Sequence, residues 1–178
     1  MNNIFGSFPG VEDLFKKWIT DSHFSIHVAI DGEKLIGISS WHIKQDNNFD
    51  KFISFGENAI QHMKGKKTAW ILNLAIDSEY RKLGLGSKLA SSHLEWLKKS
   101  NCDLVMGTSW VSGSDDNSRH LYEKAGFQRI AESSVFLRGQ MQNGAICSAC
   151  KSTECNCKSI LFSLDLKSNE LFNGTWFY

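Results

Sequence analysis

The spacing of apolar residues predicts helices in several parts of the chain. Apolar side chains three and four positions apart, the period of an amphipathic helix, recur in residues 11–20 and in the run from Gly86 to Lys99. A third, shorter helix is predicted over residues 117–125, after a loop rich in capping residues. The last of these ends at Gly126, a residue suited to a helix C-cap. Residues 51–63 are ambiguous, because Gly56 interrupts an otherwise helical spacing.

Other stretches have the apolar composition or the alternation of strands. These are residues 24–30, 34–43, 69–76, 104–111, 127–130, 134–138 and 159–166. Asp31, Gly32 and Glu33 form a hairpin-turn signal between the first two. The runs 69–76 and 104–111 are rich enough in apolar residues to be buried strands. Strands alternate with helices around the middle and a long hairpin follows, so the pattern predicts a mixed α/β sheet.

Composition indicates a globular protein and narrows the classes of partner. The 178 residues suffice for one domain, residues 1–178, and 42% hydrophobic with 22% charged residues is an ordinary balance for such a domain. A net charge of +1 gives no support for nucleic-acid binding through bulk electrostatics. No apolar run approaches the ~20 residues that span a bilayer, and the first ten residues lack the pattern of a secretory signal. We therefore expect a cytoplasmic protein without nucleic-acid or membrane partners.

The stretch from Ala69 to Ser87 has the features of a phosphate-binding turn. An apolar strand is followed by a charged loop, then by Gly84 and Gly86, and a helical pattern begins at once. The free amides at a helix start point to one spot, where the macrodipole adds partial positive charge. The two glycines let a ligand approach the backbone, because no Cβ stands in the way. The alternative is a plain left-handed turn that starts a helix.

Two motifs in the chain resemble those of a known family. Arg81-Lys82-Leu83-Gly84-Leu85-Gly86 has the Arg-x-x-Gly-x-Gly form of the acyl-CoA-binding motif of the GNAT N-acetyltransferases. Further along, the segment from Asn117 to Phe127 resembles the second signature helix of that family. The resemblance covers residues 24–166 and implies a GNAT-type mixed central sheet flanked by helices. It does not cover residues 1–20 well, because the usual opening strand is missing or much shortened.

The resemblance implies how the matched residues would bind acetyl-CoA. The turn amides would hold the pyrophosphate; they belong to Arg81, Lys82, Leu83, Gly84, Leu85, Gly86 and Ser87. The backbone of Leu74, Ala75 and Ile76 would pair with the pantetheine arm as a strand does, and strand 104–111 would separate from it to leave a cleft for the thioester. Asn117 would touch the cofactor from the other side, unless it is only a helix N-cap. The side chain of Arg81 could equally be a solvated surface cation.

Tyr122 is the candidate catalytic residue. The resemblance places it near the sulfur of acetyl-CoA, and a tyrosine, with a pKa of ~10, suits protonation of a leaving thiolate. The alternative is a ring that only packs against the sheet. The base that activates the amine is not identified, because no carboxylate occurs between Trp70 and Ile76. Asp115, Glu57 and His42 are candidate bases on flanking elements.

These features predict an acetyl-CoA-dependent N-acetyltransferase that moves an acetyl group to a primary amine by direct attack in a ternary complex. Small-molecule and peptide amines both remain open as acceptors, and a homodimer is possible. Because the central strand lacks a carboxylate, a non-catalytic acyl-CoA-binding module is the alternative.

Four of the five cysteines cluster near the C-terminal end, at Cys147, Cys150, Cys155 and Cys157. In a reducing compartment such a cluster indicates metal binding before disulfides, and four thiolates complete a tetrahedral Zn²⁺ shell. We expect a closed, structural zinc site that holds a hairpin insertion, residues 139–158. Free thiols, disulfides, a redox role and a zinc knuckle that docks a partner are the alternatives. Cys102, which stands apart, is expected to be a small buried or half-buried hydrophobe and not a nucleophile.

Overall fold

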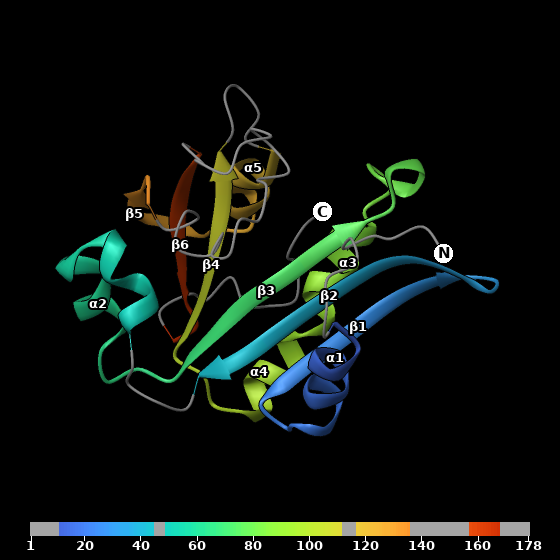
Figure 1. The fold of residues 1–178 in the computed structure, drawn as a ribbon, viewed down its shortest axis with the longest axis horizontal. Helices are drawn as coiled ribbons and strands as arrows, with labels where there is room; N and C mark the ends of the chain where they lie inside the picture. Colours follow the sequence, from blue (N-terminus) through green and yellow to red (C-terminus); the bar gives the residue numbers. More distant parts are fainter. Residues whose placement is uncertain (1–10, 45–48, 112–116, 136–156, 168–178) are drawn as a thin grey trace.

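The computed structural model describes residues 11–44, 49–111, 117–135 and 157–167. Its centre is a six-stranded sheet with the spatial order β1-β2-β3-β4-β6-β5 (Figure 1). The strands are β1 (Phe24–Asp31), β2 (Lys34–Lys44), β3 (Thr68–Ile76), β4 (Leu104–Val111), β5 (Gln128–Ser133) and β6 (Lys158–Asp165). Neighbouring strands are antiparallel except β3 and β4, which are parallel. The predicted mixed α/β sheet is confirmed.

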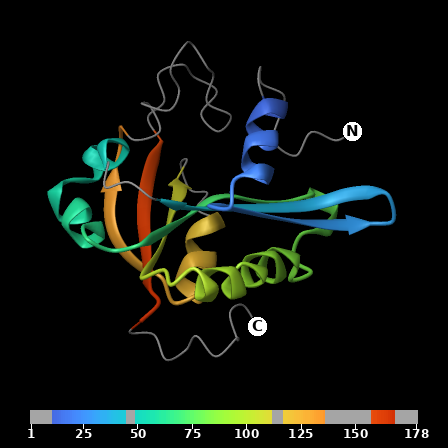
Figure 2. The same ribbon diagram turned by 90° about the horizontal axis from the view of Figure 1, so that it is seen from below.

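Helices cover both faces of this sheet. They are α1 (Val11–Thr20), α2 (Glu57–Met63), α3 (Leu85–Ser92), α4 (Leu94–Lys99) and α5 (Asn117–Lys124), with short 3₁₀ turns η1 (Asp50–Phe55) and η2 (Ser78–Tyr80). Figure 2 shows α3, α4 and α5 on one face and α1 on the other. The parallel strands β3 and β4 are connected through α3 and α4. Such a crossover is needed because the chain must return to the end of the sheet where β3 began before a parallel strand can start.

The core consists of two apolar clusters, one on each face of the sheet. Alternation along β4 divides its side chains between them: Val105 belongs to the cluster under α3–α5, whereas Leu104 and Met106 belong to the cluster under η1 and α2. Cys102 is buried in the first cluster, and burial raises the pKa of its thiol to about 11, as expected for a packing residue. Among the described residues, no helix is long and apolar enough to cross a membrane.

The helix expected from Gly86 to Lys99 is interrupted, which corrects the prediction of one continuous element. His93 lies between α3 and α4, and its N–H bonds to the carbonyl of Ala90, three residues back. Its side chain is fully buried, with Nδ1 2.9 Å from Ser25 Oγ and Nε2 3.0 Å from Ser39 Oγ. The break therefore coincides with a histidine that is fastened to β1 and β2 rather than with a glycine or proline.

Two other stretches also differ from their simplest prediction. The ambiguous residues 51–63 form η1 and α2, and Gly56, with φ of 89°, separates them. A strand over residues 134–138 is not formed where the structure describes it: β5 ends at Ser133, and Ser134 and Val135 are bends. Residues 136–138 lie outside the described part of the chain.

Candidate active site

The two central strands, β3 and β4, are paired at one end only. Their parallel pairing stops at Trp70 and Met106, although both strands continue. Where pairing stops, the register of β3 against β2 shifts, so that Leu72 is an extra residue on β3. Such a bulge bends its strand, and Figure 1 shows β3 and β4 diverging from this point. The separation of the strands implied by the family resemblance is present.

A cavity of about 280 Å³ lies where the strands diverge. Aromatic rings form much of its wall: Trp41, Trp110, Tyr122 and Phe127. Its polar lining comes from Asn73, Thr108 and Ser118. No carboxylate or histidine lines it among the described residues, so the cavity itself contains no obvious base for an amine.

Tyr122 lies in the wall of this cavity, held by α5. Its ring stacks on Phe162 at 4.9 Å between centroids and meets the edge of Phe127 at 5.1 Å. The hydroxyl is 3.5 Å from the carbonyl oxygen of Thr108, at the long end for a hydrogen bond. Burial raises the pKa of Tyr122 well above its usual value, so the hydroxyl stays protonated at neutral pH and is a weaker acid than an exposed tyrosine. The ring packs in the core, as the alternative interpretation has it, and the residue also lines the cavity, while its role as proton donor stays a prediction.

Gly107 on β4 makes the position of Tyr122 possible, although it belongs to neither of the two motifs. A Cβ at this glycine would stand 2.4 Å from the hydroxyl oxygen of Tyr122, closer than two such atoms can approach. The ring therefore rests directly on the backbone of β4. A glycine inside a predicted strand marks a close approach, and this signal at residue 107 could have identified the contact.

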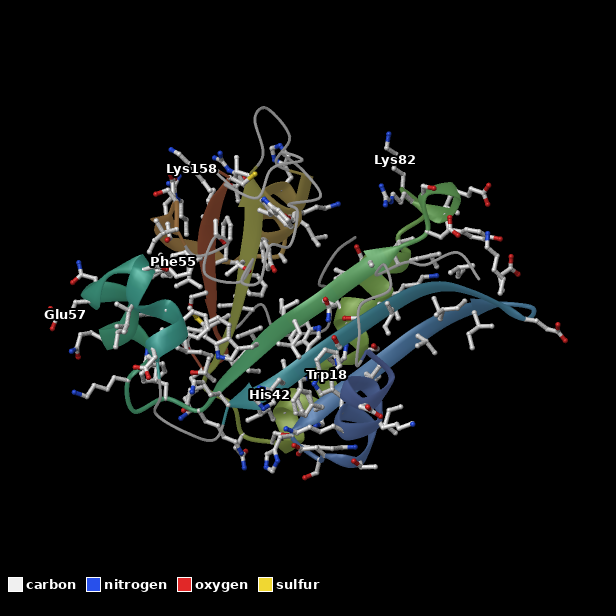
Figure 3. The ribbon with its side chains drawn as sticks, in the orientation of Figure 1. Trp18, His42, Phe55, Glu57, Lys82 and Lys158 are labelled. Carbon is white, nitrogen blue, oxygen red and sulfur yellow. The ribbon has the colours of Figure 1, made fainter. Side chains whose placement is uncertain are left out.

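The turn between β3 and α3 has the geometry of an open helix start. Gly84 adopts φ of 75° and precedes Leu85, the first residue of α3, and no side chain caps this end. The first helical bond at this end runs from the Lys88 N–H to the Gly84 carbonyl, which leaves the amides before it free for a ligand. Leu83 is 64% exposed, and Figure 3 shows Lys82 pointing outward from the same turn. These amides fit an anion such as a diphosphate.

Arg81 points back to the sheet. Its Nε donates to the carbonyl oxygen of Ile76 at 3.1 Å, which closes the turn onto the end of β3. The structure thus gives this side chain a local structural contact, and the amides that follow it are the candidate phosphate ligands.

Among the described residues, no strand pairs with β3 beyond Trp70 on its side toward β4, and only alternate backbone groups point to that open edge. The Asp77 N–H donates to the Ile36 carbonyl of β2 at 2.8 Å, and backbone groups alternate in direction along a strand. Those of Ala75 therefore point to β2, whereas those of Leu74 and Ile76 point to the edge that β4 leaves open. Of the three residues predicted to pair with a pantetheine arm, Leu74 and Ile76 have the required direction.

The candidate bases named from the sequence do not gather at the cavity. His42 stacks on Phe24 at 4.2 Å between ring centroids, and Phe24 stacks in turn on Trp18 at 5.5 Å (Figure 3). His42 is not part of the cavity lining. Glu57 opens α2 and is exposed on its outer side (Figure 3). Asp115 and the side chain of Asn117 lie outside the described residues.

The cysteine cluster is described at one position only. Cys157 directly precedes β6 and is buried in the apolar cluster under η1 and α2, with Phe52, Phe55 and Leu161. The other three cysteines lie outside the described residues, and the described part of the chain shows no group of ligands that could hold a metal ion. The zinc site stays a prediction.

Comparisons with known proteins agree with this geometry. The family model described as "Acetyltransferase (GNAT) family" matches residues 5–127, more than half of the chain. No curated protein sequence is significantly similar to the chain.

Several solved structures share the fold. A GNAT family acetyltransferase from Elizabethkingia anophelis with acetyl-CoA bound superposes with a TM-score of 0.57 at 16% identity, covering 91% of this chain and 93% of that one. An acetyltransferase from Bacillus subtilis in complex with CoA gives 0.56 at 19% identity, covering 89% and 86%. An IAA acetyltransferase from Bacillus cereus gives 0.57 at 16% identity, covering 89% and 87%. At these identities the likeness concerns the fold alone, and it is the family match over residues 5–127 that shows that the chain belongs to the GNAT family of acetyltransferases.

Proposed function

We propose that the chain is an acetyl-CoA-dependent N-acetyltransferase that moves an acetyl group to a primary amine by direct attack in a ternary complex. The observation that carries the proposal is the divergence of β3 and β4, which opens a cavity with Tyr122 in its wall. The uncapped start of α3 follows directly from the end of β3 in the chain. One ligand with a diphosphate and a long amide-bearing arm suits both features. Membership of the family supports acyl transfer in general.

In this proposal each part of the site has a distinct role. The amides of residues 82–87 would bind the diphosphate, since the Arg81 N–H is bonded to the Ser78 carbonyl at 3.5 Å. The open edge of β3 would pair with the amides of the arm. A backbone N–H on that edge, at Leu74 or Ile76, would stabilise the negative charge that develops on the carbonyl oxygen. The hydroxyl of Tyr122, in the wall of the cavity, would then protonate the leaving thiolate. The amine attacks as the neutral base, its proton leaving through water.

Thiol release from acetyl-CoA in the presence of an amine panel tests the proposal. The panel should contain small amines, amino acids and peptides with free N-termini or lysines. We expect turnover of at least one class, and a Tyr122→Phe variant should lower kcat ~10²-fold or more with little change in KM for acetyl-CoA. Calorimetric titration with CoA should show binding by both forms.

One feature favours a second candidate, a non-catalytic acyl-CoA-binding module. The described lining of the cavity contains no carboxylate or histidine. Tight CoA binding without turnover of any amine would support the module, and activity that is insensitive to Tyr122→Phe would refute the role given to that hydroxyl.

The four-cysteine zinc site is a separate proposal. Four thiolates at Cys147, Cys150, Cys155 and Cys157 would form a closed, structural centre with no open position for catalysis. Its support is the spacing in the sequence, and a metal analysis of the purified chain tests it directly.

A further inference from the structure

The tip of the β1–β2 hairpin is fastened to the loop that leads into the helix start of α3. Lys34 at the beginning of β2 places its Nζ 3.2 Å from Asp77 Oδ2 and 3.1 Å from Glu79 Oε2. The same Nζ lies over the ring of Tyr80, 4.9 Å from its centroid. Tyr80 in turn donates its hydroxyl hydrogen to Asp31 Oδ2 at 2.9 Å. Residues more than forty positions apart in the sequence are thus joined by four contacts.

Asp77 is the centre of this arrangement. Its carboxylate is only 8% exposed, and its Oδ1 accepts the N–H of Glu79 at 3.1 Å while Oδ2 faces Lys34. Its own N–H is bonded to the Ile36 carbonyl on β2 at 2.8 Å. The Glu79 amide and the Lys34 ammonium hold the pKa of Asp77 below its usual value, so the group is a carboxylate at neutral pH. Side chain and backbone both fix the first residue after β3.

The fastened segment ends where the candidate phosphate turn begins. Tyr80 is followed by Arg81 and Lys82, and Lys82 has φ of 64°, a left-handed conformation that a lysine seldom adopts. Gly84 has φ of 75°, and no side chain caps α3. The residues before the turn therefore help to determine where its amides point, together with the Arg81 contact to the Ile76 carbonyl, because the turn itself contains strained backbone and no capping side chain. Figure 1 shows η2 and the hairpin tip at the same end of the sheet.

We propose that Lys34, Asp77 and Tyr80 are positioning residues that hold the turn of residues 81–87 in the conformation that binds the diphosphate of coenzyme A. The inference rests on the proposed function, since it concerns the same donor site. A turn that is held in its bound conformation loses less conformational entropy when the ligand binds. The hairpin tip thus contributes to donor affinity without touching the donor's reactive end.

A competing explanation is that Lys34 only attracts the anionic donor through its charge. Two substitutions separate the explanations, because one removes a positive charge and the other removes a negative charge. Lys34→Met removes a positive charge, so both explanations predict weaker CoA binding. Asp77→Asn removes a negative charge, so simple attraction predicts tighter binding, whereas loss of the fastening predicts weaker binding. Tyr80→Phe changes no charge and removes only the hydrogen bond to Asp31.

The experiment is calorimetric titration of CoA into the full chain and these variants, with thermal unfolding as a check on folding. We expect each of the three variants to bind CoA about fivefold more weakly, the size of effect that exposed ion-pair networks permit. Lys158→Met is the matched control, because Lys158 forms an ion pair of 2.8 Å with Glu132 on β5, outside the donor site. It should bind CoA like the unmodified chain.

A truncated donor gives a readout that general loss of structure would not produce. Acetyl-pantetheine lacks the diphosphate, so kcat/KM with this donor should be unchanged in the three variants, while KM for acetyl-CoA rises and kcat stays the same. Tighter binding by Asp77→Asn, or an equal loss with both donors, would overturn the inference. If the unmodified chain does not bind CoA at all, the proposed function fails and this inference fails with it.

Discussion

Mild acid should destabilise this protein through one buried histidine. His93 is fully buried at the break between α3 and α4, where its ring stacks on His27 at 4.3 Å and on Trp41 at 4.8 Å. Burial, with a smaller contribution from His27, lowers the pKa of His93 from 6.5 to about 3. The folded chain therefore keeps this imidazole neutral at pH values where the unfolded chain protonates it.

The magnitude follows from proton linkage. Because the folded pKa is the lower one, His93 contributes its full stability above pH 6.5 and loses it as the pH falls from 6.5 toward 3. At pH 5 the pH lies about 1.5 units below the pKa of the unfolded histidine, and each unit corresponds to ~1.36 kcal/mol. Protonation of His93 in the unfolded chain therefore lowers the free energy of unfolding by about 2 kcal/mol. This is a large share of the ~5–15 kcal/mol that stabilises ordinary domains. His27 and His62, whose pKa values are also lowered by burial, act in the same direction.

Urea unfolding at pH 7, 6 and 5, followed by tryptophan fluorescence, measures the effect. A His93→Gln variant isolates the contribution of His93, because glutamine keeps polar groups but does not titrate. Between pH 7 and pH 5 the unmodified chain should lose about 2 kcal/mol more of its unfolding free energy than this variant. His120→Gln, at a side chain that is 86% exposed, is the control and should follow the unmodified chain. Parallel losses in the unmodified chain and in His93→Gln would refute the reasoning.

Three further predictions concern the site and the cysteine cluster. Gly107→Ala should cost ~1–3 kcal/mol and lower kcat, because the new Cβ displaces Tyr122; unchanged unfolding and thiol release would contradict this. Gly86→Ala should raise KM for acetyl-CoA without loss of stability, because the new Cβ meets Ile76 only at 3.7 Å. Gly84→Ala should lower the free energy of unfolding by ~1–2 kcal/mol, because Gly84 has a φ of 75°. Equal melting temperatures for these two variants would count against the second prediction. Elemental analysis should find zinc in the purified chain and none after the first two cysteines of the cluster are replaced by serine; a metal-free native chain would exclude the site.

Local patterns in the sequence account for much of the fold. The hairpin of β1 and β2, the strands β3 and β4, the glycine turn before α3 and the end of α5 at Gly126 are all set by neighbouring residues, although β3 is buried only over Thr68–Trp70. These features depend on hydrophobic period, turn chemistry and backbone preference, which act over a few residues. The two motifs that resemble the GNAT family lie on such elements, so neighbouring residues alone mark the turn at Gly84 and Gly86 as a candidate diphosphate site.

The tertiary structure decided what depends on distant residues meeting. The helix breaks at His93, whose ring is bonded to serines of β1 and β2, and no glycine or proline marks that break. Tyr122 lies in the cavity wall because Gly107 on β4 leaves room for its ring, and the cavity exists because β3 and β4 part after three paired positions. The sequence by itself determined where a diphosphate could bind. Only packing decided which side chains face the space beside it, since that choice is made by the divergence of two strands that are almost thirty residues apart in the chain.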